Sequence, residues 1–466
     1  MIVSQISGKN QAAVLAGLSL SVLLASLGTS SANVALPSLA QAFNSTFQEV
    51  QWVVLTYLLA MTTVIVSVGR LGDLLGRRRL LLAGLIIFTG ASTLCALAPS
   101  LSLLIAARAA QGLGAAAMMA LAMALVGDTV PKGKTGSVMG LLGTVSAVGT
   151  ALGPSLGGVL ISTFDWRAIF FVNVPLGLIA LLLARQSLSA VPAKQVKPGM
   201  AFDRAGMVLL AVTLVAYSFA MTGRNGNVVF LVAAFLSFVL FIRTEARAES
   251  PLIRLAMFRT PAIAAGFAMS ALVTTVVMVT LIVGPFYLSG ALGLPTALVG
   301  AVMSVGPIVA ALAGVPAGRL VDRRGSAAAT SAGLTAMAVG CAALALIPRA
   351  FGVWGYVAPL IVLTAGYALF QAANNTAVMT GIAQDERGVV AGLLNLSRNL
   401  GLITGASVMG TVFALASGAS DVTQASAAQM ASGMRITFGV AAALATLALA
   451  ISQIVFYNRQ RARAYL

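Results

Sequence analysis

Long apolar runs separated by short polar segments recur from one end of this chain to the other. A helix needs about 20 predominantly apolar residues to cross about 30 Å of hydrocarbon. Such runs lie near residues 12–36, 50–68, 80–97, 101–127, 136–161, 166–184, 204–222, 227–243, 261–288, 296–317, 327–347, 354–379, 389–416 and 433–457. Prolines at or between their ends, such as Pro37 and Pro99, mark expected breaks. The pattern predicts an all-α membrane protein with about fourteen transmembrane helices.

The basic residues alternate between the two sides of these predicted helices. With the N-terminus in the cytoplasm, most of the 28 Lys and Arg residues fall in cytoplasmic connections. The opposite connections hold only Arg167, Arg224, Arg349 and Arg435. Because connections rich in Lys and Arg stay on the cytoplasmic side, we predict a multi-pass protein of a bacterial-type inner membrane with both termini cytoplasmic. Its basic loops would then face an anionic inner leaflet of the lipid bilayer.

Composition excludes several classes of function. Hydrophobic residues make up 59% of the chain and charged residues 8%, against about 25% charged in a soluble domain. The net charge of +17 is spread over short connections and forms no continuous stripe, so we expect no nucleic-acid partner. With no His and only Cys95 and Cys341, we expect no metal, cofactor or disulfide framework. A nucleophile would lack a base, so we expect no catalytic residues and no enzyme.

A repeated motif divides the chain into two halves. The pattern G-R-L-x-D-x-x-G occurs at residues 69–76 and again at 318–325, each after an apolar segment and on the predicted cytoplasmic side. Two related halves that meet around a midplane site are common among secondary transporters. We therefore predict a six-helix bundle at 1–185, a cytoplasmic linker at 186–203, two additional helices at 204–243, a second linker at 244–260 and a second six-helix bundle at 261–466.

Residues 69–79 resemble the loop signature of the major facilitator superfamily, G-x-L-x-D-x-x-G-R-R. Arg108-x-x-Gln111-Gly112, the glycine-rich run at 149–158 and Trp166-Arg167 resemble the fourteen-helix drug:proton antiporter branch. The resemblance covers essentially the whole chain. It implies the major facilitator fold, with two six-helix bundles plus two extra central helices, and alternating exposure of a central cavity. It also implies a secondary transporter that exports small amphipathic organic molecules or drugs by proton antiport. We expect it to function as a monomer.

The repeated motif has a role in the family. The resemblance implies a conformational latch on the cytoplasmic side, and its residues here are Gly69, Asp73, Gly76 and Arg77 in the first copy and Gly318, Asp322 and Gly325 in the second. Glycines permit tight turns and close approach of helices, and an aspartate can accept hydrogen bonds or face a helix N-terminus. The alternative interpretation is ordinary loop capping combined with anchoring by basic residues.

The glycine-rich run of the fifth segment contains Gly149, Gly153, Pro154 and Gly157. Small residues spaced by four let another helix approach closely, and the proline removes one backbone donor and bends the helix. Plain helix packing, including a dimer face, would explain the same pattern. The resemblance attaches this run to exporters and antiporters.

Polar residues inside apolar segments are the candidates for a cavity or for coupling. An arginine at a helix centre costs roughly 2.5–3.5 kcal/mol on insertion scales, so Arg108 is expected to face a cavity or a partner. Gln111 shares its helix face, one turn away. The remaining candidates form polar stripes on other predicted transmembrane helices. They are Asn33, Gln371, Asn374, Asn375, Asn395, Arg398 and Asn399. A static clamp on backbone carbonyls is the alternative for Arg108, and interhelical hydrogen bonding is the alternative for each amide.

The chain departs from the antiporter pattern in its carboxylates. Family members carry an aspartate in the first segment where this chain has Gly28, and no acid lies in the middle of any apolar segment. Proton coupling needs a group whose protonation responds to the substrate. Glu49 and Asp128, at helix ends, are the possible proton groups. The alternative is an exporter or facilitator of neutral or anionic solutes, and a remote alternative is a receptor or scaffold that transports nothing.

Overall fold

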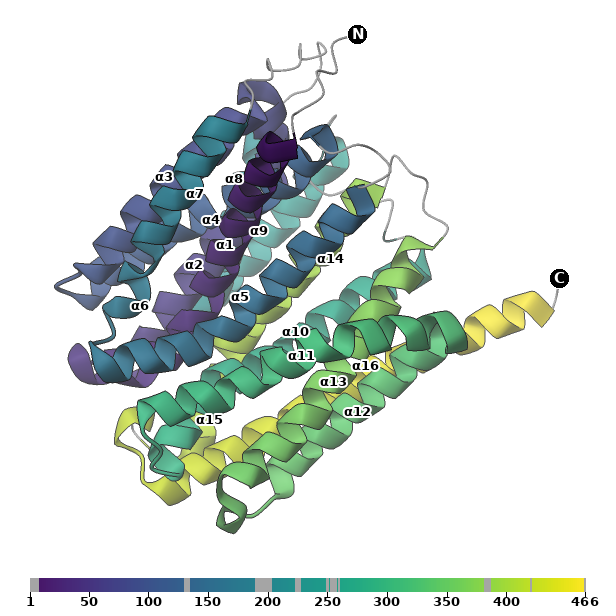
Figure 1. Cartoon of the computed structure of the whole chain (residues 1–466). Helices are drawn as coiled ribbons and strands as arrows, with labels where there is room; N and C mark the ends of the chain where they lie inside the picture. Colours follow the sequence, from purple (N-terminus) through teal and green to yellow (C-terminus); the bar gives the residue numbers. More distant parts are fainter. Residues whose placement is uncertain are drawn as a thin grey trace, which may run out of the picture. The chain divides into compact units, whose positions relative to one another are not determined.

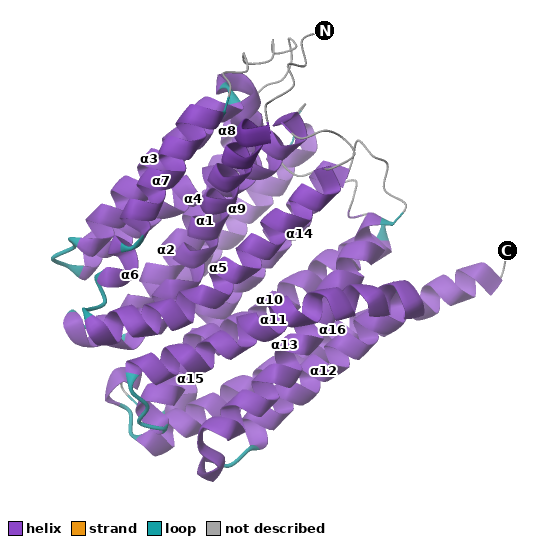
Figure 2. Cartoon of the chain, viewed as in Figure 1, coloured by secondary structure: helices purple, strands orange, loops and turns teal. Residues whose placement is uncertain are grey.

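The computed structural model describes residues 8–129, 135–188, 203–222, 228–248, 251, 258, 260–380, 387–419 and 421–464. Within these residues the regular structure is entirely helical (Figure 2). This follows from the composition, because a helix satisfies all its backbone hydrogen bonds within one segment and is therefore favoured in lipid. Most of the predicted linkers at 186–203 and 244–260 lie outside the described residues.

Within its described residues, the first half of the chain forms nine helices (Figure 1). They are α1 (Gly8–Ala42), α2 (Phe47–Leu75), α3 (Arg77–Ala96), α4 (Leu101–Thr129), α5 (Thr135–Thr163), α6 (Ala168–Phe171), α7 (Asn173–Ser187), α8 (Arg204–Thr222) and α9 (Val228–Arg247). The predicted sixth segment corresponds to α6 and α7 together. The two additional helices predicted at 204–243 correspond to α8 and α9.

The second half contains longer helices interrupted by π-helical and 3₁₀ turns. They are α10 (Pro261–Phe286), η3 (Tyr287–Ala291), α11 (Thr296–Arg324), α12 (Ser326–Leu346), η4 (Arg349–Phe351), α13 (Gly352–Met379), α14 (Arg387–Thr404), η5 (Gly405–Met409), α15 (Gly410–Ser417), η6 (Val422–Gln424) and α16 (Ala427–Ala464). The π-helices η3 and η5 each continue a membrane-spanning helix, and η5 joins α14 to α15.

Length and composition support the predicted number of spans. Among the described residues, thirteen stretches are long and apolar enough to cross a membrane, and each coincides with a predicted segment. The fifth predicted segment falls on α5, where the apolar stretch Val148–Thr163 is shorter than the others. The predicted all-α membrane fold is confirmed.

Three predicted helix ends are wrong. The first segment was expected to stop before Pro37, but α1 continues through this proline to Ala42. A proline costs one backbone hydrogen bond, which a long helix tolerates. The repeated motif was expected in loops, but its residues before the last glycine belong to α2 and α11. Only the final glycine of each copy breaks the helix, because Gly76 and Gly325 have φ of 93° and 80°.

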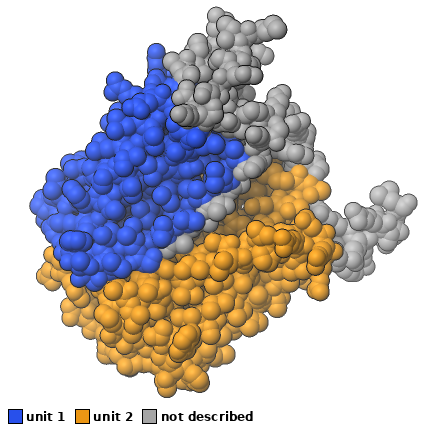
Figure 3. All heavy atoms as spheres, viewed as in Figure 1, with its two compact units in different colours: residues 1–35, 52–215, 233–252 blue, residues 36–51, 216–232, 253–466 orange. Residues whose placement is uncertain are grey.

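The helices pack into two compact units, coloured separately in Figure 3. Unit 1 contains residues 1–35, 52–215 and 233–252, and unit 2 contains residues 36–51, 216–232 and 253–466. In unit 1, α3 packs against α4 and α7. In unit 2, α12 packs against α13 and α16, and α10 packs against α14 and α16. The connection between α1 and α2 belongs to unit 2, although the sequence places it in the first half.

Candidate functional site

Arg108, on α4, is the largest side chain by volume among those fully buried in the described structure. Its Nε donates to the carbonyl of Val53 on α2 at 2.8 Å. Its Nη1 donates to the carbonyl of Gly28 on α1 at 3.1 Å and to Oε1 of Gln111 at 2.6 Å. One side chain therefore ties α1, α2 and α4 together inside unit 1. The shared face of Arg108 and Gln111 that the sequence predicts is confirmed.

Aromatic rings and further polar groups complete the surroundings of this arginine. The guanidinium carbon lies 4.2 Å from the ring centroid of Tyr57 and 5.8 Å from that of Phe170, so both rings offer their faces to the charge. The Tyr57 hydroxyl donates to the carbonyl of Ala25 at 2.7 Å. Gln111 donates through Nε2 to Oγ of Ser92 on α3 at 2.8 Å. The network thus includes groups from α1 to α4.

The network contains a positive charge without an acid beside it. Within the described residues, no carboxylate contacts the guanidinium, and its Nη2 has no hydrogen-bond partner. Buried charges are ordinarily paired and their donors satisfied. A Cβ added at Gly28 would lie 3.2 Å from the Tyr57 hydroxyl and 3.4 Å from the Phe88 ring. A side chain at position 28 would therefore enter the same polar pocket as Arg108.

Two of the predicted amide residues, Asn33 and Asn374, form hydrogen bonds within a helix or between helices. Asn33 is buried and donates to the carbonyl of Thr29 at 3.1 Å, one turn earlier in α1. Asn374 is buried on α13 and donates to the carbonyl of Gly266 on α10 at 3.1 Å. The second bond joins two helices of unit 2, as interhelical hydrogen bonding predicts. The Oδ1 atoms of both amides have no partner in the described residues.

The candidates around Arg398 are less buried than those around Arg108. Arg398 is half-buried on α14 and donates through Nη2 to Oδ1 of Asn395, which is exposed. Asn399 is buried on the same helix. Gln371 and Asn375 are half-buried on α13. The predicted grouping of Arg398 with Asn395 is confirmed, while Arg108 is the deeper of the two arginines.

In the repeated motif, the structure describes a close approach of another helix at Gly72. At Gly69 and Gly318, no atom of another described element lies within 4 Å of an added Cβ. At Gly72, a Cβ would lie 2.6 Å from the side chain of Leu121 on α4. Arg77 extends this contact between α2, α3 and α4, because its Nη1 donates to the carbonyl of Ala124 at 3.2 Å.

The structure describes the side chain of only one of the two motif aspartates. The side chain of Asp73 lies outside the described part of the chain. Asp322 is exposed at the end of α11. The latch role therefore stays a prediction for both copies.

The glycine-rich face of α5 packs on α1 inside unit 1. A Cβ at Gly149 would lie 2.8 Å from the carbonyl oxygen of Leu23, and one at Gly153 would collide with the side chain of Ser30. Gly157 faces the carbonyl of Ser31 at a looser 3.4 Å. Pro154 lies within α5. The small residues therefore serve close helix packing within the chain, as one of the two interpretations predicts.

The possible proton groups lie at helix ends. Glu49 is exposed, and its Oε2 accepts hydrogen bonds from the backbone N of Thr46 at 2.8 Å and from its hydroxyl at 3.0 Å. The Thr46 hydroxyl in turn accepts from the backbone N of Glu49 at 3.3 Å. This reciprocal pair is a capping box, so Glu49 has a structural role at the start of α2. The side chain of Asp128 lies outside the described residues.

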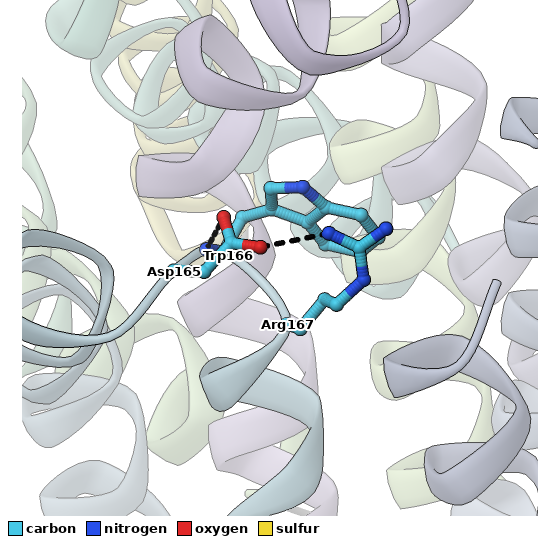
Figure 4. Close-up of polar contacts among 3 residues, drawn as sticks. All are labelled: Asp165, Trp166 and Arg167. Carbon is cyan, nitrogen blue, oxygen red and sulfur yellow. Dashed lines mark hydrogen bonds and ion pairs between the residues drawn. The ribbon is translucent and has the colours of Figure 1, made fainter. Parts of the chain in front are cut away.

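The Trp166-Arg167 pair, part of the family resemblance, forms a local cluster with the preceding aspartate (Figure 4). Asp165 accepts from the backbone N of Trp166 at 2.6 Å and from Nη1 of Arg167 at 2.7 Å. The guanidinium of Arg167 lies over the Trp166 ring, 4.4 Å from its centroid. This cluster fixes the turn that leads into α6.

Sequence reasoning missed a buried contact at the start of α2. Gln51 is fully buried in unit 2, and its Nε2 donates to the carbonyl of Ala406 in η5 at 3.1 Å. Phe47, also fully buried, packs edge-on against Phe286 and Phe413 at centroid distances of 4.8 and 5.8 Å. A glutamine at the first turn of an apolar segment was the available signal.

Comparisons with known proteins agree with the fold. The profile of the Major Facilitator Superfamily matches residues 18–406. The chain is 32% identical over 400 residues to the multidrug resistance protein Stp of Mycobacterium tuberculosis, covering 82% of this chain and 72% of that protein. It is 29% identical over 395 residues to the riboflavin transporter RibZ of Clostridioides difficile, covering 84% of this chain and 86% of that protein.

A solved structure of a bacterial homologue of the human lysosomal transporter Spinster shares the fold. The TM-score is 0.72 at 15% identity, and the alignment covers 96% of this chain and 97% of that one. Family profile, relatives and fold therefore agree over nearly the whole sequence, and the members they identify are transporters and not enzymes. This chain belongs to the major facilitator superfamily of membrane transporters.

Proposed function

We propose that this transporter exports small amphipathic organic molecules by alternating access, in antiport with protons. The observation that carries the proposal is the buried network of Arg108, which joins a permanent charge to polar groups of α1 to α4. Charged and polar groups within membrane helices mark transport pathways. Similarity to the multidrug resistance protein Stp supports drug-like substrates.

The proton in such a cycle needs a carrier. Binding a proton at Glu49 would weaken its two hydrogen bonds to Thr46 and so loosen the start of α2. Asp128, at the end of α4, is twenty residues along the same helix from Arg108. We propose Asp128 as the first carboxylate to test and Glu49 as the second.

The unpaired guanidinium favours a second candidate function, the export or facilitated diffusion of neutral or anionic organic solutes. A buried cation with an unused donor attracts a carboxylate or an electron-rich carbonyl and repels a cationic drug. The relative RibZ, whose name gives riboflavin as its solute, supports solutes other than cations. In this second function the proton gradient would have little effect on the rate.

Purified protein in liposomes separates these functions. An inside-acidic pH gradient is imposed, and the uptake of ethidium and the internal pH are followed together, then riboflavin and simple organic acids are tested in the same way. Ethidium accumulation with matching proton release supports drug:proton antiport. Loss of that coupling in Asp128→Asn, with coupling kept in Glu49→Gln, assigns the proton to Asp128.

Two other results contradict the first proposal. Transport of riboflavin or organic acids without dependence on the gradient supports the second candidate. If none of the solutes moves while a soluble partner binds the purified protein, the chain acts as a receptor or scaffold and both transport proposals are wrong. Liposomes without protein, and liposomes with heat-inactivated protein, serve as the controls for leakage.

A further inference from the structure

A small cavity in unit 2 brings two arginines together. It has a volume of about 40 Å³, and its lining includes Tyr287, Ile347, Arg349, Met434 and Arg435. These residues come from η3, the turn after α12, η4 and the first turns of α16. Because one buried water needs about 10–15 Å³, the cavity has room for about three waters or for one group of the size of a phosphate.

The cavity lies at the end of unit 2 opposite the repeated motif. The helix α12 begins at Ser326, directly after the motif glycine Gly325, and ends at Leu346 beside the cavity. Its 21 residues correspond to about 30 Å of helix, the thickness of the hydrocarbon. The cavity is therefore at the level of one membrane–water interface, and Asp322 is at the level of the other.

Both arginines of the cavity are free to bind an anion. Each is exposed, and neither forms an ion pair or a side-chain hydrogen bond with any residue that the structure describes. Tyr287, which is 6% exposed, lines the same cavity. The guanidinium groups of two lining arginines are donors suited to the oxygens of a phosphate. Arg167, in contrast, is paired with Asp165.

Large apolar side chains close in sequence to the lining residues are exposed. Leu346, Phe351 and Trp354 are 64 to 76% exposed, and Ile436, next to Arg435, is 49% exposed. Exposed tryptophan and other aromatic side chains are typical of the headgroup level of a bilayer. An anion bound here would thus have hydrocarbon chains beside it, which distinguishes a lipid from a water-soluble solute.

We propose that the cavity between Arg349 and Arg435 binds the phosphate of an anionic membrane phospholipid, with its acyl chains against Leu346, Phe351 and Trp354. A basic pocket between transmembrane helices is the kind of site that binds anionic headgroups. The site is separate from the Arg108 network and does not depend on the proposed substrate. Since each arginine near an anionic headgroup contributes roughly a fivefold preference, the pair should favour phosphatidylglycerol over phosphatidylcholine about tenfold or more.

Fluorescence quenching tests this proposal, because the chain has only three tryptophans. Replacing Trp52 and Trp166 by Phe leaves Trp354, beside the cavity, as the reporter. The full-length protein is reconstituted in phosphatidylcholine vesicles that contain a minor fraction of brominated phosphatidylglycerol or, for comparison, the same fraction of brominated phosphatidylcholine. We expect the anionic lipid to quench Trp354 more strongly than the zwitterionic one.

Matched variants assign the excess quenching to the cavity. Arg349→Gln with Arg435→Gln should reduce it to the level of brominated phosphatidylcholine, and either single replacement should reduce it in part. Arg349→Lys with Arg435→Lys, which keeps the charge, should retain most of it. Arg167→Gln should leave it unchanged, since that arginine belongs to another cluster. Thermal unfolding of each variant confirms that the fold is intact, and the single variants suffice if the double one does not fold.

Three outcomes would overturn the proposal. The first is equal quenching by the two brominated lipids in the unmodified cavity. The second is an excess that persists in the folded glutamine variants. The third is loss of the excess when millimolar inorganic phosphate is added, which would assign the site to a water-soluble anion.

Discussion

At the residue scale, the contrast between Arg108 and position 28 is the main chemical feature of unit 1. Arg108 uses two nitrogens to bind carbonyls and the amide of Gln111, and leaves Nη2 without a partner in the described residues. The family pattern has an acid at position 28, and here it is Gly28. Among the described residues, the Arg108 guanidinium contacts neutral acceptors and two aromatic rings and no acid.

Replacing Arg108 by Ala should abolish transport and lower stability. The change leaves the carbonyls of Val53 and Gly28 and the amide of Gln111 without their donor, at a cost of about 1–3 kcal/mol for each buried group. Arg108→Lys is the matched control, since it keeps the charge but not the fork of donors. Initial rates in liposomes and thermal unfolding in detergent measure both effects. Normal rates in a folded Ala variant would reduce Arg108 to a packing role.

Gly28→Asp should add proton coupling if the missing acid limits it. The new side chain would begin beside the Tyr57 hydroxyl, within the network that contains the unused Nη2 of Arg108, and an ion pair with that guanidinium would stabilise the carboxylate. Gly28→Asn, similar in size but neutral, is the control for crowding. We expect more protons released per substrate in the Asp variant alone. Identical proton release in the two variants would show that coupling lies elsewhere.

The sequence predicts part of this site, and physical reasons limit the rest. The 3.6-residue period places Arg108 and Gln111 on one face, and the structure confirms their hydrogen bond. The partners of Arg108 on α1 and α2 are backbone carbonyls. Every residue has a carbonyl, so the sequence does not show which ones tertiary packing brings to the arginine. The capping box of Glu49, in contrast, was readable from the Thr46-x-x-Glu49 spacing, and its role as a proton group stays a prediction.

At the element scale, the sequence predicts where helices lie better than where they end. Hydropathy marks the membrane-spanning part of each helix, but α2 and α11 continue beyond it through the polar motif to Gly76 and Gly325. Polar residues can continue a helix in water, so the hydrophobic pattern stops before the helix does. Positive φ at the glycines, which other residues adopt only with strain, sets the actual ends.

Gly153→Ala should destabilise unit 1 by overpacking α5 against α1. The added methyl group would collide with Ser30 and approach the backbone N of Ser31 to 2.9 Å, and overpacking typically costs about 1–3 kcal/mol. Gly90→Ala on α3, where no atom of another described element lies within 4 Å of the new Cβ, is the control and should be neutral or slightly stabilising. Thermal unfolding measures both. Equal stabilities of the two variants would contradict the packing assigned to the α5 glycines.

At the scale of the whole molecule, the connection between α1 and α2 belongs to unit 2 although it joins two helices of the first half. Phe47 and Gln51 are buried there, and the backbone N of Phe47 donates to Asp421 at 3.4 Å. The π-helix η5 exposes the carbonyl of Ala406 that Gln51 binds, because π-helical turns release backbone groups from the regular ladder. If alternating access separates α2 from unit 2, these contacts break in each cycle.

A reversible cross-link between Gln51 and Gly410 tests that requirement and the transport cycle most directly. The Gln51 amide touches the position that a Cβ at Gly410 would take, so cysteines at both positions, in a chain without Cys95 and Cys341, should form a disulfide. We predict that the oxidised protein in liposomes does not transport and that reduction restores the rate. A disulfide between positions 213 and 237, whose hydroxyls on α8 and α9 lie 3.0 Å apart, should leave transport unchanged. Full transport by the oxidised 51–410 protein would contradict a cycle in which α2 separates from unit 2.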